Sequence, residues 1–246
     1  MGPFTEEERY LFDLQGFLVR RNALSAAEVA EANAAVDAMA LPAPTRSIES
    51  QRFTGHCAAA PVMRSLIDHH AVLEILAEIC GRELRLDHTY GIAMAPGTSG
   101  LGLHGGPVPF DPCQYYTVDS SGIHCGLVAV QWALVDAWPG EGGFACVPGS
   151  HKASMQFPDV IGLNHPTVRE VPLRAGDVVL FTEALTHGTL TWRGATDRRT
   201  LLYKYSPGNS SWALEPAVDS AVLGLLTPRQ RAMCEPPAVA HRQAVV

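Results

Sequence analysis

The feature that most constrains the fold of this chain is a succession of short strand-like segments between residues 83 and 206. Residues 84–94 alternate apolar and polar positions with a period of two, and residues 126–135 form an apolar, β-branched run. Both patterns are typical of β-strands, and the second indicates a more buried strand. Many short strands with glycine and proline turns between them predict a β-sandwich or barrel. Further short strands are predicted at 144–147, 168–173, 178–181, 189–192 and 200–205.

Helices are predicted before and after the strands. The evidence is capping boxes, in which Ser or Thr is followed three positions later by Glu or Gln, and helix-like apolar spacing. The predicted helices cover about residues 5–14, 25–40 and 61–80, and a further helix starts at Thr227. The segment 42–60 is irregular and is interpreted as a solvated loop rather than a substrate lid. We therefore expect helices packed on one side of a β-core.

We expect one domain over residues 1–246, because sandwiches and barrels of this length are often single domains. Its predicted parts are a helical N-terminal part at about 1–82, a β-core at about 83–206 and a C-terminal extension at 207–246. No internal repeat is visible in the sequence.

The composition excludes several classes of function. Apolar residues make up 47% of the chain and charged residues 17%, which argues against intrinsic disorder. A net charge of −7 argues against a nucleic-acid polymer as partner, since such partners call for a basic face. The sequence has no apolar signal segment and no run near the roughly 20 apolar residues of a membrane span. The six cysteines are scattered and predict reduced thiols, so a cytoplasmic protein without membrane contact is expected.

Two distant histidines and an arginine form the candidate site. His104 lies in a turn rich in glycine and proline, and His187 and Arg198 follow far downstream. Imidazole suits Fe(II), and a site with few protein ligands leaves positions open for oxygen chemistry. The third ligand expected in such a site is a carboxylate two residues after the first histidine, and here that residue is Gly106.

The chain resembles the phytanoyl-CoA dioxygenase-like branch of the Fe(II)/2-oxoglutarate oxygenases over about residues 5–206. The order and number of the matching motifs carry the resemblance. It implies a double-stranded β-helix, or jelly roll, which agrees with the strand pattern. The motifs are Phe12 with Gly16-Phe17, Gln131 to Asp136, Gly142 to Lys152, Arg174 to Asp177, and His187 to Thr189 followed by Arg198.

The resemblance also implies roles for individual residues. His104 and His187 would be the iron ligands, and Arg198, with Thr189 beside it, would bind the far carboxylate of 2-oxoglutarate. A guanidinium suits this task because it grips a carboxylate with two parallel hydrogen bonds. Arg199 would point to the opposite face of its strand. The residues expected to hydrogen-bond the cosubstrate near the metal are Gln114 or Gln131.

The departure from the family pattern is Gly106, because hydroxylating members carry His-x-Asp where this chain has His104-Gly105-Gly106. Members with glycine or alanine at this position are halogenases, in which chloride takes the place of the carboxylate. The resemblance thus implies Fe(II), 2-oxoglutarate and chloride as cofactors, and chlorination of an unactivated aliphatic carbon of a small metabolite. Chain length and the sequence around His104 also resemble nucleotide halogenases that chlorinate the sugar of deoxyadenosine monophosphate.

Two other hypotheses remain open at this point. Asp111 or Asp119, in the loop that follows, could supply the third ligand of a hydroxylase. Alternatively, the chain could be a noncatalytic barrel that binds a small molecule. Pro107 and Pro109 favour an extended path that carries Asp111 away from the metal, which supports the halogenase. Four basic residues could bind an anionic substrate, although solvated charge is the expected state of each: Arg46, Arg52, Lys152 and Lys204.

Overall fold

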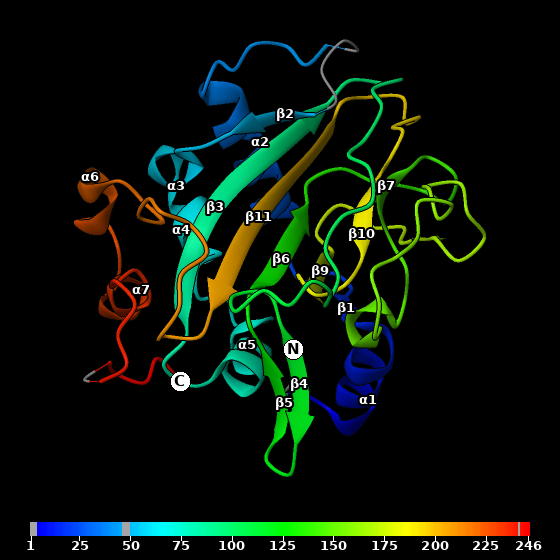
Figure 1. Cartoon of the computed structure of the whole chain (residues 1–246). Helices are drawn as coiled ribbons and strands as arrows, with labels where there is room; N and C mark the ends of the chain where they lie inside the picture. The colour runs from blue at the N-terminus through cyan, green and yellow to red at the C-terminus, as the bar shows by residue number, and fades with distance from the viewer. Residues whose placement is uncertain (1–3, 46–49, 241) are drawn as a thin grey trace.

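The computed structural model describes residues 4–45, 50–240 and 242–246, so Arg46 lies outside the described residues. Two sheets face each other across an apolar interior, which is the jelly-roll arrangement predicted from the sequence (Figure 1). Neighbouring strands of the larger sheet are antiparallel. Its order is β1 (Phe17–Arg20), β9 (Val178–Thr182), β6 (Val128–Ala133), β11 (Arg198–Ser206), β3 (Arg85–Met94) and β2 (Gln51–Phe53).

The smaller sheet packs against the larger one through aromatic and aliphatic side chains, including Phe144 and Phe181. It contains β10 (His187–Leu190), β7 (Gly143–Cys146) and β8 (Arg169–Glu170) in that order. A separate hairpin is formed by β4 (Tyr116–Asp119) and β5 (Gly122–Cys125).

The helices lie outside the space between the two sheets, and α6 and α7 lie beside β3, on the side away from β10 (Figure 1). The capping boxes predicted at Thr5, Ser25 and Thr227 are confirmed. The helices are α1 (Glu6–Gln15), α2 (Ala26–Ala38), α3 (His56–Ala59), α4 (Pro61–Ser65), α5 (Leu73–Cys80), α6 (Ser220–Leu223) and α7 (Pro228–Met233), with a 3-10 turn at Ser150–Lys152.

The two faces of the larger sheet have different neighbours. Tyr203 and Tyr205 of β11 point toward the helices, where their hydroxyls donate to the backbone carbonyls of Met63 and Ile67. Residues at the alternate positions, from Arg198 to Lys204, face the smaller sheet instead, because side chains alternate along a strand. This interior face is the one that positions the candidate site.

Several local predictions were wrong. The helix predicted over 61–80 is broken into α4 and α5, because the imidazole Nδ1 of His69 accepts the amide of Ala71 and competes with helical bonding. The strand predicted over 168–173 is only β8. The predicted loop 42–60 contains β2 and α3, since pairing with the edge of β3 makes a strand of three residues that carry no strong strand pattern.

The described helices include none that is both long and apolar enough to cross a membrane. All six cysteines are free thiols, as predicted.

Candidate active site

The structure brings His104 and His187 together. His187 is the first residue of β10, and its backbone amide and carbonyl exchange hydrogen bonds of 2.9 Å with those of His104. The two ring centroids lie 4.2 Å apart. The segment around His104 therefore extends the smaller sheet beside β10, which places two residues that are distant in sequence side by side.

The backbone also sets which ring nitrogen each histidine presents. The Nδ1 of His104 lies 2.9 Å from the carbonyl oxygen of Gly102, and that of His187 lies 2.7 Å from the carbonyl oxygen of Leu185. A carbonyl only accepts, so each Nδ1 donates and each Nε2 keeps its lone pair. Burial lowers the pKa of His187 to about 4, which maintains the neutral form that a metal ion needs.

The glycines after His104 have different surroundings. Gly105 has φ +77°, and a Cβ there would lie 2.7 Å from the carbonyl oxygen of Leu185 and 2.8 Å from that of Glu183. A side chain at 105 is therefore excluded by both backbone conformation and space. Gly106 has φ +120°, but a Cβ there would meet only the Thr186 hydroxyl, at 3.4 Å. Space for a side chain thus exists at the position where the family motif has aspartate.

Among the described residues, no third protein ligand accompanies the histidines. In the described part of the chain, no group of three or more His, Cys, Asp or Glu residues is placed to hold a metal ion. The carboxylate of Asp111 accepts the amide of Cys113 and closes a local turn. Asp119 lies on the exposed β4–β5 hairpin, where its carboxylate is bound by Ser121 and His124. Neither aspartate supplies the ligand considered from the sequence.

Arg198 is a buried cation without a counter-ion among the described residues. It opens β11 on the interior face, and the one side-chain hydrogen bond that it makes within the described structure runs from Nη1 to the sulfur of Met94, at 3.5 Å. Gly143 makes room for it, since a Cβ there would lie 3.1 Å from the arginine Nε. Burial lowers the pKa of Arg198 to about 10. An uncompensated buried charge is costly, so this guanidinium fits an anionic ligand.

Gln131 shares a narrow cavity with Arg198 and Thr200. Its Nε2 is buried and has no hydrogen-bond partner among the described residues. A cosubstrate with a carboxylate would satisfy both groups, so the residues present fit 2-oxoglutarate. Thr189 lies in β10 two positions after His187, on the same strand face.

Gln114 is placed differently. It lies in a turn before β4, and its only hydrogen bond in the described structure is from its backbone amide to Asp111. The cosubstrate role of either glutamine stays a prediction, and the geometry favours Gln131. Arg199 points to the opposite face, as predicted, where it forms a 2.7 Å ion pair with Asp37 of α2.

Comparison with known proteins decides the family. The family model of phytanoyl-CoA dioxygenase (PhyH) matches residues 12–200. The chain belongs to this family. It is accordingly an enzyme of the Fe(II)/2-oxoglutarate-dependent oxygenase type, which argues against the noncatalytic barrel.

Solved structures agree with this family assignment. HygX from Streptomyces hygroscopicus, crystallised with nickel and 2-oxoglutarate, is similar with 28% identity and a TM-score of 0.77, over 88% of this chain and 92% of that one. HygX has also been crystallised with iron, and with nickel, 2-oxoglutarate and hygromycin B. SnoK, a carbocyclase from nogalamycin biosynthesis, shares the fold, with 19% identity, a TM-score of 0.67 and 98% of both chains covered. None of the curated proteins compared with this chain matches it.

This family member carries a buried ion pair that sequence reasoning missed. Lys204 of β11 donates to the carboxylate of Glu183, just after β9, at 2.6 Å, and both side chains are buried. The prediction that Lys204 is solvated was wrong, because its strand face looks into the interior rather than to water. The available signal was the even spacing from Arg198, which places both residues on one face. Arg52 and Lys152 are exposed, as expected.

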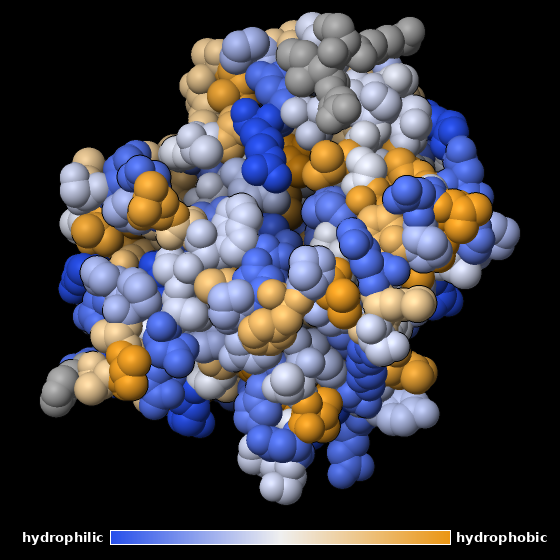
Figure 2. Space-filling model, viewed as in Figure 1, coloured by the Kyte–Doolittle hydropathy of each residue, from blue (hydrophilic) through white to orange (hydrophobic). Residues whose placement is uncertain are grey.

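A cavity of about 610 Å³ is lined by residues of the segments 52–58, 88–90 and 212–222, and neither Lys204 nor Glu183 is among its lining residues. Tyr90 lines it, and the Lys204 Nζ lies 5.7 Å from the Tyr90 ring centre. Figure 2 shows a hollow on the face seen in Figure 1, between the regions over β3 and β10, with both hydrophilic and apolar residues along its walls. Arg52 also lines the cavity of about 610 Å³, with its guanidinium carbon 4.2 Å from the Tyr90 ring centre.

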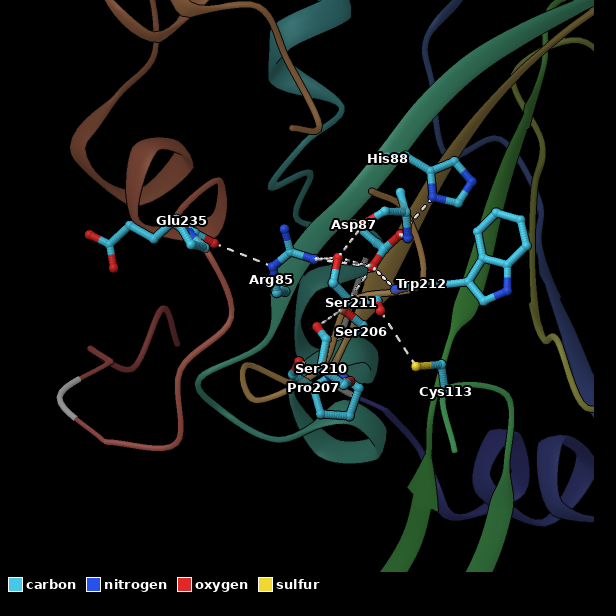
Figure 3. A network of polar contacts seen from close by, with 12 residues as sticks. Arg85, Asp87, His88, Cys113, Ser206, Pro207, Ser210, Ser211, Trp212 and Glu235 are labelled. Atoms are coloured by element: carbon cyan, nitrogen blue, oxygen red, sulfur yellow. Dashed lines mark hydrogen bonds and ion pairs between the residues drawn. The ribbon is translucent and has the colours of Figure 1, made fainter. Parts of the chain in front are cut away.

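Asp87 is fully buried and binds residues that line the cavity (Figure 3). Its carboxylate accepts the backbone amides of Trp212 and Ala213 and the Nδ1–H of His88, at 2.7 to 3.0 Å. Burial raises the pKa of Asp87, but these hydrogen bonds outweigh that effect and the net pKa is lowered. His88 thus presents Nε2 and stacks between Tyr90 and Trp212 at the cavity wall.

Proposed function

We propose that this enzyme uses Fe(II), 2-oxoglutarate and O₂ to chlorinate an unactivated aliphatic carbon of a small polar metabolite. The observation that carries the proposal is Gly106: glycine stands where the family motif has its carboxylate ligand, and in the described structure no Asp or Glu completes a three-residue metal site with the two histidines. A metal held by only two side chains has a coordination position for chloride, whereas a carboxylate there would occupy it and oppose the anion.

The chain's own residues supply binding and orientation. His104 and His187 would hold the iron through Nε2, since each Nδ1 is committed to a backbone carbonyl. Arg198 would bind the far carboxylate of 2-oxoglutarate, with Gln131 donating a further hydrogen bond. The Phe181 ring, 4.7 Å from the His187 ring, keeps water from this side of the site. When bound, iron and 2-oxoglutarate would activate O₂, and O₂ would supply the oxidising power that removes a hydrogen atom from the substrate carbon.

We propose that the substrate occupies the 610 Å³ cavity. HygX binds the small molecule hygromycin B, which supports a small-molecule substrate here. The exposed Trp212 ring offers a face for a planar group, and Arg52 offers a guanidinium for an anionic one. These two features are compatible with a nucleotide such as deoxyadenosine monophosphate, which we take as the first compound to test.

Hydroxylation of the same carbon is the second candidate. The observation in its favour is Glu183, a buried carboxylate whose charge acts on both His104 and His187. If Glu183 left Lys204 and bound the metal, three protein ligands would surround it and no position would be provided for chloride.

The test uses the full chain loaded with Fe(II) and 2-oxoglutarate without oxygen. A weak visible charge-transfer band is expected at this stage, and its absence would contradict the cofactor assignment. Oxygen, chloride and small polar metabolites, with deoxyadenosine monophosphate first, are then added and the products are analysed by mass spectrometry. We expect a product with a chlorine isotope doublet that forms only with chloride. Addition of an oxygen atom at saturating chloride would instead support hydroxylation.

Gly106→Asp is the decisive variant and Gly106→Ala its matched control. Both place a Cβ at φ +120°, so both carry the same backbone strain of about 1–3 kcal/mol. Only the aspartate can occupy the coordination position. We expect Gly106→Asp to lose chlorination and Gly106→Ala to retain it. Chlorination by Gly106→Asp, or its loss in a folded Gly106→Ala, would contradict the mechanism.

A further inference from the structure

We infer that Glu183 and Lys204 set the strength of metal binding: Glu183 supplies the negative charge that the absent ligand would carry, and Lys204 holds that carboxylate off the metal. The inference rests on the proposed two-histidine site. It goes beyond that proposal because it assigns a role to a pair of residues outside the ligand set.

The backbone places Glu183 next to the histidines. Its carbonyl oxygen is one of the two atoms that a Cβ at Gly105 would strike, and the His187 Nδ1 lies 3.3 Å from the same point. Phe181, two residues earlier on the same strand face, has its ring 4.7 Å from the His187 ring. The amide of Glu183 is bound to the carbonyl of Leu127, which keeps this segment in place after β9.

The opposite charges of Glu183 and Lys204 lie in the buried interior. The Glu183 carboxylate and the Lys204 ammonium are 2.6 Å apart and both side chains are buried. Burial raises the pKa of Glu183, but the adjacent Lys204 ammonium outweighs this effect and the net pKa is lowered, so the carboxylate stays ionised. A buried ion pair contributes little net stability compared with an apolar pair of similar volume. Its field on the neighbouring histidines is the property that the apolar pair would lack.

The two charges have opposite effects on a bound cation. Removal of the carboxylate alone leaves an ammonium that repels the metal, so metal binding should weaken. Removal of the ammonium alone leaves a buried carboxylate without a partner, which a divalent cation would compensate, so metal binding should strengthen. Removal of both should nearly restore the original affinity. A purely structural role predicts weaker binding in both single variants.

The experiment is a double-mutant cycle on the full chain: wild type, Glu183→Gln, Lys204→Met and the double variant. Fe(II) affinity is measured without oxygen by titration calorimetry, and thermal unfolding reports folding. Groups that act on metal ligands from outside typically change affinity roughly 10- to 100-fold. We expect Glu183→Gln to bind Fe(II) at least about 10-fold more weakly, Lys204→Met at least about 10-fold more tightly, and the double variant to lie between them.

Lys152→Met is the matched control, because it removes an exposed lysine that pairs with Asp13 at 2.6 Å, and it should leave Fe(II) affinity unchanged. Failure of wild type to bind Fe(II), or equal binding by His187→Ala, would contradict the proposed function itself. If wild type binds and His187→Ala does not, unchanged or weaker binding by Lys204→Met would overturn the inference. If a single variant does not fold, the double variant still tests it, since Fe(II) affinity at least about 10-fold below wild type would contradict the expected cancellation.

Discussion

The two faces of β11 perform different tasks. On the face toward the helices, Arg199 pairs with Asp37, and Tyr205 donates to the carbonyl of Ile67. On the face toward the smaller sheet, Arg198 has no charged partner among the described residues, and Lys204 forms an ion pair with Glu183 and lies against the Tyr90 ring. One face therefore satisfies its polar groups with the protein itself, and the other holds a buried guanidinium that no charged group of the described residues neutralises.

We therefore expect residues on the helix side of β11 to contribute to stability and residues on its interior side to contribute to ligand binding. Neighbouring residues such as Arg198 and Arg199 have the same chemistry but opposite environments, because side chains alternate across the sheet. Substitutions on the helix side should change the free energy of unfolding, whereas those on the interior side should change ligand affinity. The following predictions test this separation, in order of decreasing expected effect.

Arg198→Gln should weaken 2-oxoglutarate binding at least about 100-fold, because a buried carboxylate would lose its charged partner. Arg199→Gln is the control on the neighbouring residue and should bind 2-oxoglutarate as wild type does, since Arg199 contacts α2. Anaerobic titration of the Fe(II) protein with 2-oxoglutarate measures both. Equal losses of 2-oxoglutarate affinity in the two variants would contradict the proposed difference between the two faces of β11.

The free energy of unfolding should depend on pH through the protonation of His56. The His56 ring packs against Tyr203 of β11 with a ring-centroid distance of 5.4 Å. Burial lowers the pKa of His56 to about 4, below the value of about 6.5 in an unfolded chain. The folded state therefore binds fewer protons, so this stabilisation is present above about pH 6.5 and is lost as the pH falls toward 4. The loss amounts to about 3 kcal/mol at pH 4.

The measurement compares wild type with His56→Phe by urea unfolding at a series of pH values. The stability of the variant relative to wild type should rise as the pH is lowered, while 2-oxoglutarate affinity at neutral pH stays the same. Parallel pH profiles for the two proteins would show that His56 is not held neutral by burial.

Tyr205→Phe should lower the free energy of unfolding by about 1–3 kcal/mol. The variant leaves buried backbone carbonyls, those of Ile67 and Leu66, without the hydroxyl that now donates to them. Chemical denaturation measures this loss. A change in 2-oxoglutarate affinity without a change in stability would contradict the assignment of this face to folding.

Local patterns predicted much of the fold and part of the site. Period-two alternation predicted β3, and the capping boxes predicted α1 and α2, because these signals depend on residues close in sequence. Through the family resemblance, the order of His104, His187 and Arg198 led us to expect the two histidines together, and the structure places them side by side, whereas the roles of all three residues stay predictions. The hairpin β4–β5 was not predicted, since each of its strands has only four residues and only one of the eight, Cys125, is buried.

By itself, the sequence determined that glycine stands where a carboxylate ligand is expected, and that Arg198 and Arg199 face opposite sides of a strand. Only the tertiary structure decided which carboxylate lies near the histidines. Asp111 and Asp119 are closer to His104 in sequence, yet local turns hold both, whereas Glu183 arrives from another strand. The physical reason is that pairing of distant strands, rather than separation along the chain, determines which charges share the buried interior.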